Sequence, residues 1–254
     1  MNYKKIRLGE SLIIPIYERK KYFMKLSKRL LTIASLVQEN SIVADIGTDH
    51  GYVPAYLIQN KISKKVIGSD ISKGSLEKII DYIKEIGLEK QIEPRLGDGL
   101  KVIKPYEVDT VIIAGMGGVL IKEILDYDKS VTNSITNFIL QPMIGAKELR
   151  MYLMENDFEI VKEELAKEEN KYYEIIYAKK GKAHIEKDIY FEIGEELILE
   201  KHPVAKDFIE NKIIMAESIL RELEGKQTEK MEQRYIELSN RIQEYKEVLK
   251  KIES

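Results

Sequence analysis

A cluster of acidic, imidazole and glycine residues follows the first apolar run of the chain. The stretch VADIGTDHGYVP ends that run at Asp45 and then places Gly47 and Gly51 around Asp49 and His50. Glycine at such a point permits a tight turn and a close approach of the next helix, so backbone N–H groups can face a ligand. The acid and the imidazole add groups that accept or donate protons. The stretch therefore indicates a ligand loop.

Two more acids follow the next two apolar runs. Asp70 stands 23 residues after Gly47, in GSDIS, and Asp98 stands in GDGL at the predicted end of a third strand. An acid at the end of a second strand can accept from both hydroxyls of a ribose, and Asp98 is placed to flank an adenine. Each acid alone is as well explained as a helix cap. Three acids at successive strand ends indicate a nucleoside ligand.

A fourth apolar run ends in the small residues IAGMGG. Because Gly115, Gly117 and Gly118 carry no side chain, a cofactor can approach closely, and Met116 offers a soft apolar contact beside a sulfonium. The alternative is a helix start that needs glycine for packing. The Asn/Asp-Pro-Pro-aromatic motif of many amine methyltransferases is absent here, which disfavours methylation of an exocyclic amine.

Strand and helix patterns alternate around these residues. A helix is predicted over residues 26–37, with Ser27 near its start. The segments that follow are strands at 41–47, 65–71, 91–99, 108–117 and 137–143, and helices at 53–60, 74–87, 119–127 and 146–157. This alternation predicts a doubly wound parallel sheet that binds ligands at the carboxyl ends of its strands. Residues 158–180 then read as two strands joined by a polar turn, which is typical of class I methyltransferases.

The chain turns helical and charged beyond about Gly181. Apolar residues there step by four and three, at Ile209, Ile213, Ala216, Leu220 and Leu223, and after Gly225 at Met231, Tyr235, Leu238, Ile242, Tyr245, Leu249 and Ile252. Two such seams predict an antiparallel, coiled-coil-like helical hairpin. The hairpin packs within the chain, or it holds an RNA or a second subunit. With 13 basic and 17 acidic residues over 181–254, this unit alone attracts polyanions weakly.

Composition narrows the possible chemistry. The 254 residues are 44% hydrophobic and 33% charged, enough for one α/β core and a smaller second unit. The absence of cysteine excludes disulfides and thiolate metal sites. Because there are only three histidines (His50, His184 and His202), no metal is predicted. No run approaches the roughly 20 apolar residues of a membrane span, so we expect a cytoplasmic protein without membrane contact.

Basic residues gather at the start of the chain. Nine Lys or Arg residues stand against two acids from Lys4 to Arg29, although the net charge of the whole chain is −2. Such a cluster is either a solvated lead-in or a phosphate-binding segment. Lys28 and Arg29 are the substrate-binding candidates within it.

The motifs DIGTDHGYVP, GSDIS, GDGL, IAGMGG and LQPM, in this order, make the chain resemble the bacterial TrmK family of tRNA (adenine(22)-N1)-methyltransferases. The resemblance runs from about Leu26 through the helical hairpin. It implies a Rossmann-like domain for S-adenosyl-L-methionine over residues 24–181 and a helical domain over 182–254. Residues 1–23 look like an extension, and we expect a monomer or a weak dimer.

The resemblance also assigns a cofactor site and a tRNA substrate. The implied cofactor residues are Asp45, Gly47, Asp49, His50 and Gly51 in the loop, Asp70 and Ile71 at the ribose, Asp98 and Gly99 at the adenine, and Ala114, Gly115, Met116, Gly117 and Gly118 at the methyl-donor end. We take Asp49, His50 and Tyr52 as catalytic candidates at the lip of the pocket. Gln141 and Met143, at the predicted end of the fifth strand, are further candidates for the substrate edge.

Two other functions compete with this interpretation. A nicotinamide-dependent oxidoreductase shares the strand-end acid but expects Gly-x-Gly-x-x-Gly, whereas Gly47 and Gly51 are four residues apart. A non-catalytic RNA-binding protein could keep the fold, although it would have no need of Asp45, Asp70 and Asp98.

Overall fold

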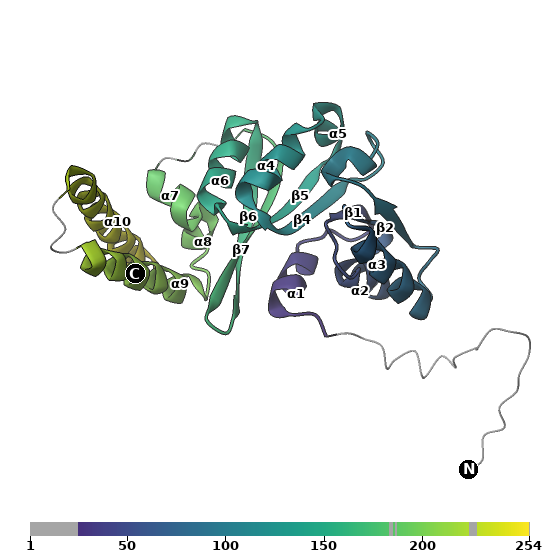
Figure 1. The fold of residues 1–254 in the computed structure, drawn as a ribbon, viewed down its shortest axis with the longest axis horizontal. Helices are drawn as coiled ribbons and strands as arrows, with labels where there is room; N and C mark the ends of the chain where they lie inside the picture. Colours follow the sequence, from purple (N-terminus) through teal and green to yellow (C-terminus); the bar gives the residue numbers. More distant parts are fainter. Residues whose placement is uncertain (1–24, 183–184, 186, 224–227, 254) are drawn as a thin grey trace, which may run out of the picture.

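The structure, a computed structural model, describes residues 25–182, 185, 187–223 and 228–253, and these form a seven-stranded sheet flanked by helices (Figure 1). Predictions for residues 1–23, for His184 and for Gly225 lie outside the described residues. The strands are β1 (Ser41–Ile46), β2 (Ser63–Asp70), β3 (Ile92–Leu96), β4 (Thr110–Gly117), β5 (Asn137–Ile144), β6 (Phe158–Glu168) and β7 (Lys171–Lys180).

The strand order is β3-β2-β1-β4-β5-β7-β6. The first five strands in this order are parallel, and β7 and β6 form the predicted antiparallel hairpin at one edge. The chain reverses its direction of winding between β1 and β4, and ligands bind open α/β sheets at such a switch point. The predicted fold class, a Rossmann-like methyltransferase sheet, is therefore confirmed.

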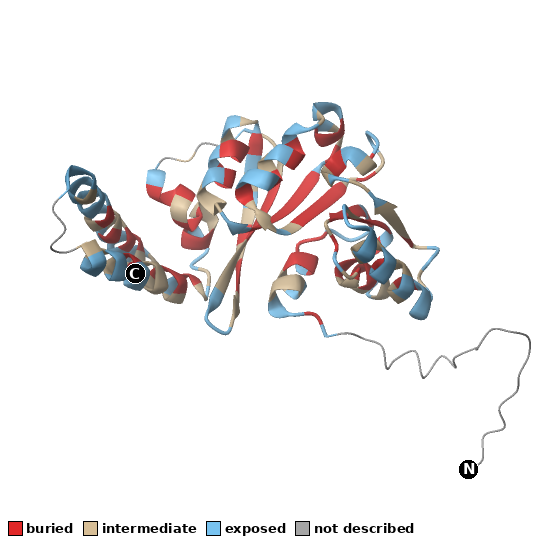
Figure 2. Cartoon of the chain, viewed as in Figure 1, coloured by how far each residue is buried: buried red, intermediate tan, exposed pale blue. Residues whose placement is uncertain are grey.

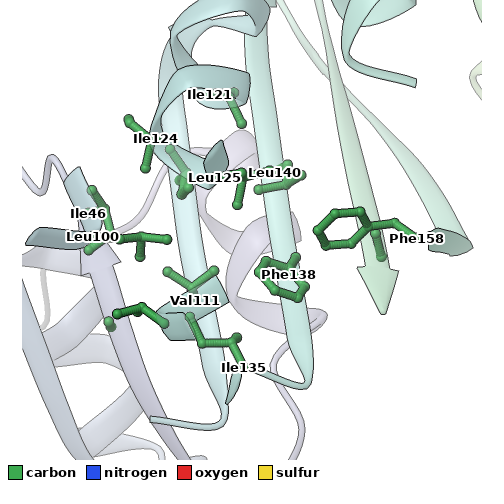
Figure 3. Close-up of a cluster of buried hydrophobic side chains, with 14 of the residues drawn as sticks. Ile46, Leu100, Val111, Ile121, Ile124, Leu125, Ile135, Phe138, Leu140 and Phe158 are labelled. Carbon is green, nitrogen blue, oxygen red and sulfur yellow. The ribbon is translucent and has the colours of Figure 1, made fainter. Parts of the chain in front are cut away.

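Helices cover both faces of this sheet. They are α1 (Lys28–Ser35), α2 (Tyr52–Gln59), α3 (Lys73–Glu85), α4 (Gly118–Asp126), α5 (Lys129–Ser134) and α6 (Ala146–Glu155), with a short 3-10 helix, η2 (Gly99–Val102). Apolar residues of α1, α2 and α3 pack on one face, and those of α4, α5 and α6 pack on the other (Figure 2). Figure 3 shows the second of these cores, where Leu125 and Ile121 lie over Val111 and Leu140.

Local signals explain where two of the helices begin. The hydroxyl of Ser27 accepts from the N–H of Leu30, and the hydroxyl of Ser72 accepts from the N–H of Ser75. A side-chain oxygen at this position satisfies one of the free N–H groups at a helix start. The predicted helix over 26–37 is thus confirmed with its cap at Ser27.

A second core lies beside the edge hairpin. It is built by α7 (Asp188–Ile193), α8 (Glu195–Leu199), α9 (Ala205–Leu223) and α10 (Glu229–Glu253), together with Leu165 and Tyr172 from the hairpin. Lys206 pairs with Glu253, and Glu217 pairs with Lys246, so α9 and α10 run antiparallel.

Most of the predicted seam of the two long helices is buried or partly buried, but Tyr235 is 41% exposed. Its placement in the seam was wrong because α10 is six residues longer than α9, so the first turns of α10 extend past Leu223, where α9 ends. Val248, which lies outside the predicted pattern, is buried instead.

A buried guanidinium joins the sheet to the second core. Arg150 of α6 donates to Glu163 of β6 and Glu174 of β7, both at 2.7 Å, and to the carbonyl of Phe191 in α7 at 2.9 Å. Its side chain is 1% exposed. Charges so deep in a protein are tolerated only when they are paired and hydrogen-bonded, so these contacts fix α7 against the hairpin.

Candidate active site at the carboxyl ends of the strands

The first turn, between β1 and α2, has the backbone form that its glycines predict. Gly47 has φ +77° and Gly51 has φ +71°, a region that strongly favours glycine. A Cβ on Gly51 would lie 3.3 Å from Ile79, so this glycine also lets α3 pack closely. Gly47 and Thr48 both donate to the carbonyl of Ser69, so these two N–H groups do not face a ligand. Those two bonds tie the end of β1 to the end of β2.

Asp45 lies beneath this turn and is 6% exposed. Burial raises its pKa from 3.8 to about 6, and a hydrogen bond from Thr48 and the charge of Arg29 oppose that rise. A buried carboxylate gains most from a cationic or N–H-donating neighbour. The position is therefore suited to a ligand that carries an ammonium group.

The catalytic candidates Asp49, His50 and Tyr52 lie together at the surface. Nε2 of His50 is 3.1 Å from Oδ2 of Asp49, and the rings of His50 and Tyr52 stack with centroids 5.0 Å apart. Two residues of α3 complete the cluster, because Lys78 lies 3.6 Å from Asp49 and the ring of Tyr82 meets Tyr52 edge-on. Sequence reasoning missed these two residues, which lie about 30 positions away in the chain.

The ends of β2 and β3 carry the other two acids. Asp70 accepts from the N–H of Ser72 at 2.7 Å, and Ile71 beside it is 71% exposed. Asp98 was predicted to end a strand, but β3 ends at Leu96, and Asp98 precedes η2 and pairs with Lys101 at 2.6 Å. The strand ends early because the glycines on both sides of Asp98 favour a turn.

A small cavity opens beside Asp98. Its volume is about 180 Å³, and it is lined by Gly99, Leu100, Leu120, Ile124 and Tyr127 among others. Apolar side chains from η2 and α4, together with Lys101 and Glu123, thus line a slot next to Asp98. Sequence reasoning identified Asp98 and Gly99 there but missed the residues from α4, because no periodicity distinguishes a lining residue from a core residue.

The glycine run at the end of β4 has two different roles. Gly115 has φ +79°, and the pairing of β4 with β5 shifts register on both sides of Met116. A Cβ on Gly47 would lie 2.2 Å from Cε of Met116, so this methionine reaches across to the first turn. Gly118 instead fits the alternative of a helix start that needs glycine for packing, since a Cβ there would lie 2.2 Å from the carbonyl oxygen of Gly145. Ala114 and Gly117 are half-buried beside them.

The substrate-edge candidates fall into two groups. Met143 and Lys28 are exposed, at the end of β5 and the start of α1. Gln141 was predicted at a strand end, but β5 continues to Ile144, and Gln141 is fully buried inside it. The guanidinium of Arg29 turns inward and donates to Oε1 of Gln141 at 2.8 Å.

No three His, Asp or Glu side chains of residues 25–253 that the structure describes gather as a metal-ion site. Over the same residues, no helix has the length and apolar content needed to cross a bilayer.

Comparison with known proteins identifies the family. Residues 26–176 match a family model described as a methyltransferase domain. The tRNA (adenine(22)-N(1))-methyltransferase of Bacillus subtilis is 33% identical over 236 residues, which cover 89% of this chain and 98% of that protein.

Solved structures of similar proteins have the same fold, and two of them hold S-adenosyl-L-methionine or S-adenosyl-homocysteine. A structure of M. capricolum TrmK in complex with S-adenosyl-homocysteine gives a TM-score of 0.78 at 31% identity, covering 90% of this chain and all of that one. A Streptococcus pneumoniae protein in complex with S-adenosyl-L-methionine gives 0.80 at 30% identity, covering 89% of this chain and all of its own. The chain belongs to the TrmK family of bacterial tRNA (adenine(22)-N1)-methyltransferases.

Proposed function

We propose that this protein transfers a methyl group from S-adenosyl-L-methionine to N1 of adenine 22 in tRNA. The observation that carries the proposal is the buried Asp45 carboxyl beneath the Gly47–Gly51 turn at the switch point of the sheet. The relatives named for this reaction align along about nine tenths of the chain. A nicotinamide-dependent oxidoreductase and a non-catalytic RNA-binding protein are the less favoured functions.

The residues at the strand ends suit this cofactor. Asp45 offers a buried carboxylate to the ammonium group, and Asp70, with Ile71, offers an acid to the ribose. Asp98 and Gly99 border a slot for the adenine ring. The remaining cofactor candidates are Gly47, Asp49, His50 and Gly51 in the first turn, and Ala114, Gly115, Met116, Gly117 and Gly118 in the second.

The reaction depends more on the placement of the adenine base than on proton transfer. S-adenosyl-L-methionine supplies an electrophilic methyl group, which a ring nitrogen with an in-plane lone pair accepts without a base first removing a proton. The protein must then hold the base in line and exclude water. The stacked rings of His50 and Tyr52 give a flat surface on which an opened base can rest. Asp49, beside them, can accept from the exocyclic amine as positive charge develops.

The exposed candidates belong to the tRNA side. Lys28 meets backbone phosphate, and Met143 offers an apolar contact at the rim of the site. We further propose that residues 24–181 form the cofactor-binding unit and residues 182–254 the helical unit of a monomer or a weak dimer. Residues 1–23 are an extension of the first unit.

The test is to supply labelled methyl donor and unmodified tRNA and then to map the product by digestion and mass spectrometry. Methyl-adenine with the methyl at N1 of position 22 is the expected product, and a transcript with guanine at that position should accept no methyl group. Label at another base, or in both transcripts equally, would refute the proposal.

A further inference from the structure

Gln141 has a side chain whose hydrogen-bonding capacity is used up inside the protein. Its Oε1 accepts from Nη1 of Arg29 at 2.8 Å and from the N–H of Gly115 at 3.1 Å. Its Nε2 donates to the carbonyl of Pro142 at 2.8 Å and to Sδ of Met143 at 3.7 Å. An amide has two acceptor sites and two donors, so a bound base could reach Gln141 only by breaking one of these bonds.

Arg29 brings a second element to the same point. Its guanidinium lies over the ring of Tyr173, 5.4 Å from the centroid, and its backbone N–H donates to Glu168 at 2.7 Å. Both partners belong to the β6–β7 hairpin, so α1 is fixed to the hairpin while its arginine reaches the ends of β4 and β5. Helix α1 and strand β4 thus meet strand β5 at the amide of Gln141.

The bond to Gly115 fixes an otherwise irregular piece of backbone. Gly115 has φ +79° and lies within a shift in the pairing of β4 with β5, between Ala114 and Met116. Glycine in such a position is free to leave it, because it has no side chain to restrict its dihedral angles. Oε1 of Gln141, held by the charged Arg29, restrains the irregular Gly115–Gly117 turn at the end of β4 before any ligand arrives. Such preorganisation strengthens binding.

We propose that Gln141 and Arg29 are positioning residues, which hold the Gly115–Gly117 turn in the form that receives the methyl donor. This inference adds a structural role to the proposed function. It rests on that function only because it places the Gly115–Gly117 turn at the cofactor site. It also replaces the direct contact with substrate that the sequence predicts for both residues.

The test measures affinity for S-adenosyl-homocysteine by calorimetry, which does not depend on the base that the protein methylates. Gln141→Met removes both acceptor bonds and Arg29→Met removes the charge, so each should weaken binding roughly tenfold. Gln141→Glu keeps two acceptors and should bind at least about threefold more tightly than Gln141→Met. The KM for tRNA should stay within about twofold of the wild-type value in all three variants, since neither residue contacts RNA.

Asn137 provides the matched control, because it is a buried amide at the other end of β5. It accepts from the hydroxyl of Tyr177 and donates to that of Thr110. Asn137→Ala should lower the melting temperature about as much as Gln141→Met and leave the affinity for S-adenosyl-homocysteine unchanged.

Three results would each overturn the proposal: unchanged affinity in Gln141→Met, equal losses in Gln141→Met and Gln141→Glu, or a similar loss in Asn137→Ala. Methylation of a different base by the wild type would refute the proposed function and leave this inference standing.

Discussion

Replacing Asp45 by Asn should make the protein more stable and at the same time impair its binding of the cofactor. Burial raises the pKa of Asp45 from 3.8 to about 6, so the folded protein holds this proton more tightly than the unfolded chain does. Between about pH 4 and pH 6 the free energy of unfolding therefore falls as the pH rises. At pH 7 the charged form costs about 3 kcal/mol.

Asparagine has nearly the same shape and no charge. We expect Asp45→Asn to raise the free energy of unfolding at pH 7 by up to about 3 kcal/mol and the melting temperature by several degrees. The gain should shrink near pH 4, where the wild-type carboxyl is itself protonated. Urea unfolding at the two pH values measures both effects.

Cofactor affinity should move in the opposite direction. If the Asp45 carboxylate accepts from the ammonium group of the ligand, wild-type affinity for S-adenosyl-homocysteine falls roughly tenfold per pH unit below about pH 6. Asp45→Asn should bind weakly at every pH. Asp109→Asn is the matched control, since Asp109 accepts from the N–H of Ile42 at the opposite end of the sheet. A variant that binds as tightly as the wild type, or is less stable at pH 7, would refute the reasoning.

Three further predictions concern other parts of the site and fold. Gly47→Ala should lower stability by about 1–2 kcal/mol, because φ is +77° and the new Cβ meets Met116, and should abolish S-adenosyl-homocysteine binding in calorimetry. Arg150→Met leaves Glu163 buried without its partner, so urea unfolding should show a loss of about 3–5 kcal/mol, while methyl transfer per folded molecule stays near normal. Asp49→Ala should cut the turnover of methyl transfer to tRNA sharply with little change in melting temperature, as Asp49 is exposed; near-normal turnover would remove it from the mechanism.

Local patterns were sufficient to predict the fold. The strands alternate with helices at the spacing of crossover connections, and Ser27 marks the start of α1 by its hydroxyl. The polar turn after Glu168 is long enough only for a hairpin, which distinguishes a methyltransferase sheet from one that is wholly parallel. Six-residue α5 was missed because so short a helix has no measurable period.

The site could be predicted only in part. Residues at strand ends were found, because parallel strands bring their carboxyl ends to one edge. Contacts between distant positions were not found, since Arg29 and Gln141 stand 112 positions apart and nothing in the sequence between them indicates that the two side chains meet. For the same reason the sequence did not show which candidates are buried, and Gln141 was predicted at the substrate edge although it is fully buried.

The Met116 methyl group has a practical use in spectroscopy. Because Cε of Met116 lies 2.2 Å from where a Cβ of Gly47 would be, a ligand that touches the turn on that side must displace it. The thioether side chain rotates about three bonds, so it can move aside without a change in the backbone. A carbon-13 label on the eight methionine methyl groups, with the Met116 signal assigned by Met116→Leu, would report occupancy of the site directly. The enzyme thus carries its own nuclear magnetic resonance probe for screening inhibitors without tRNA.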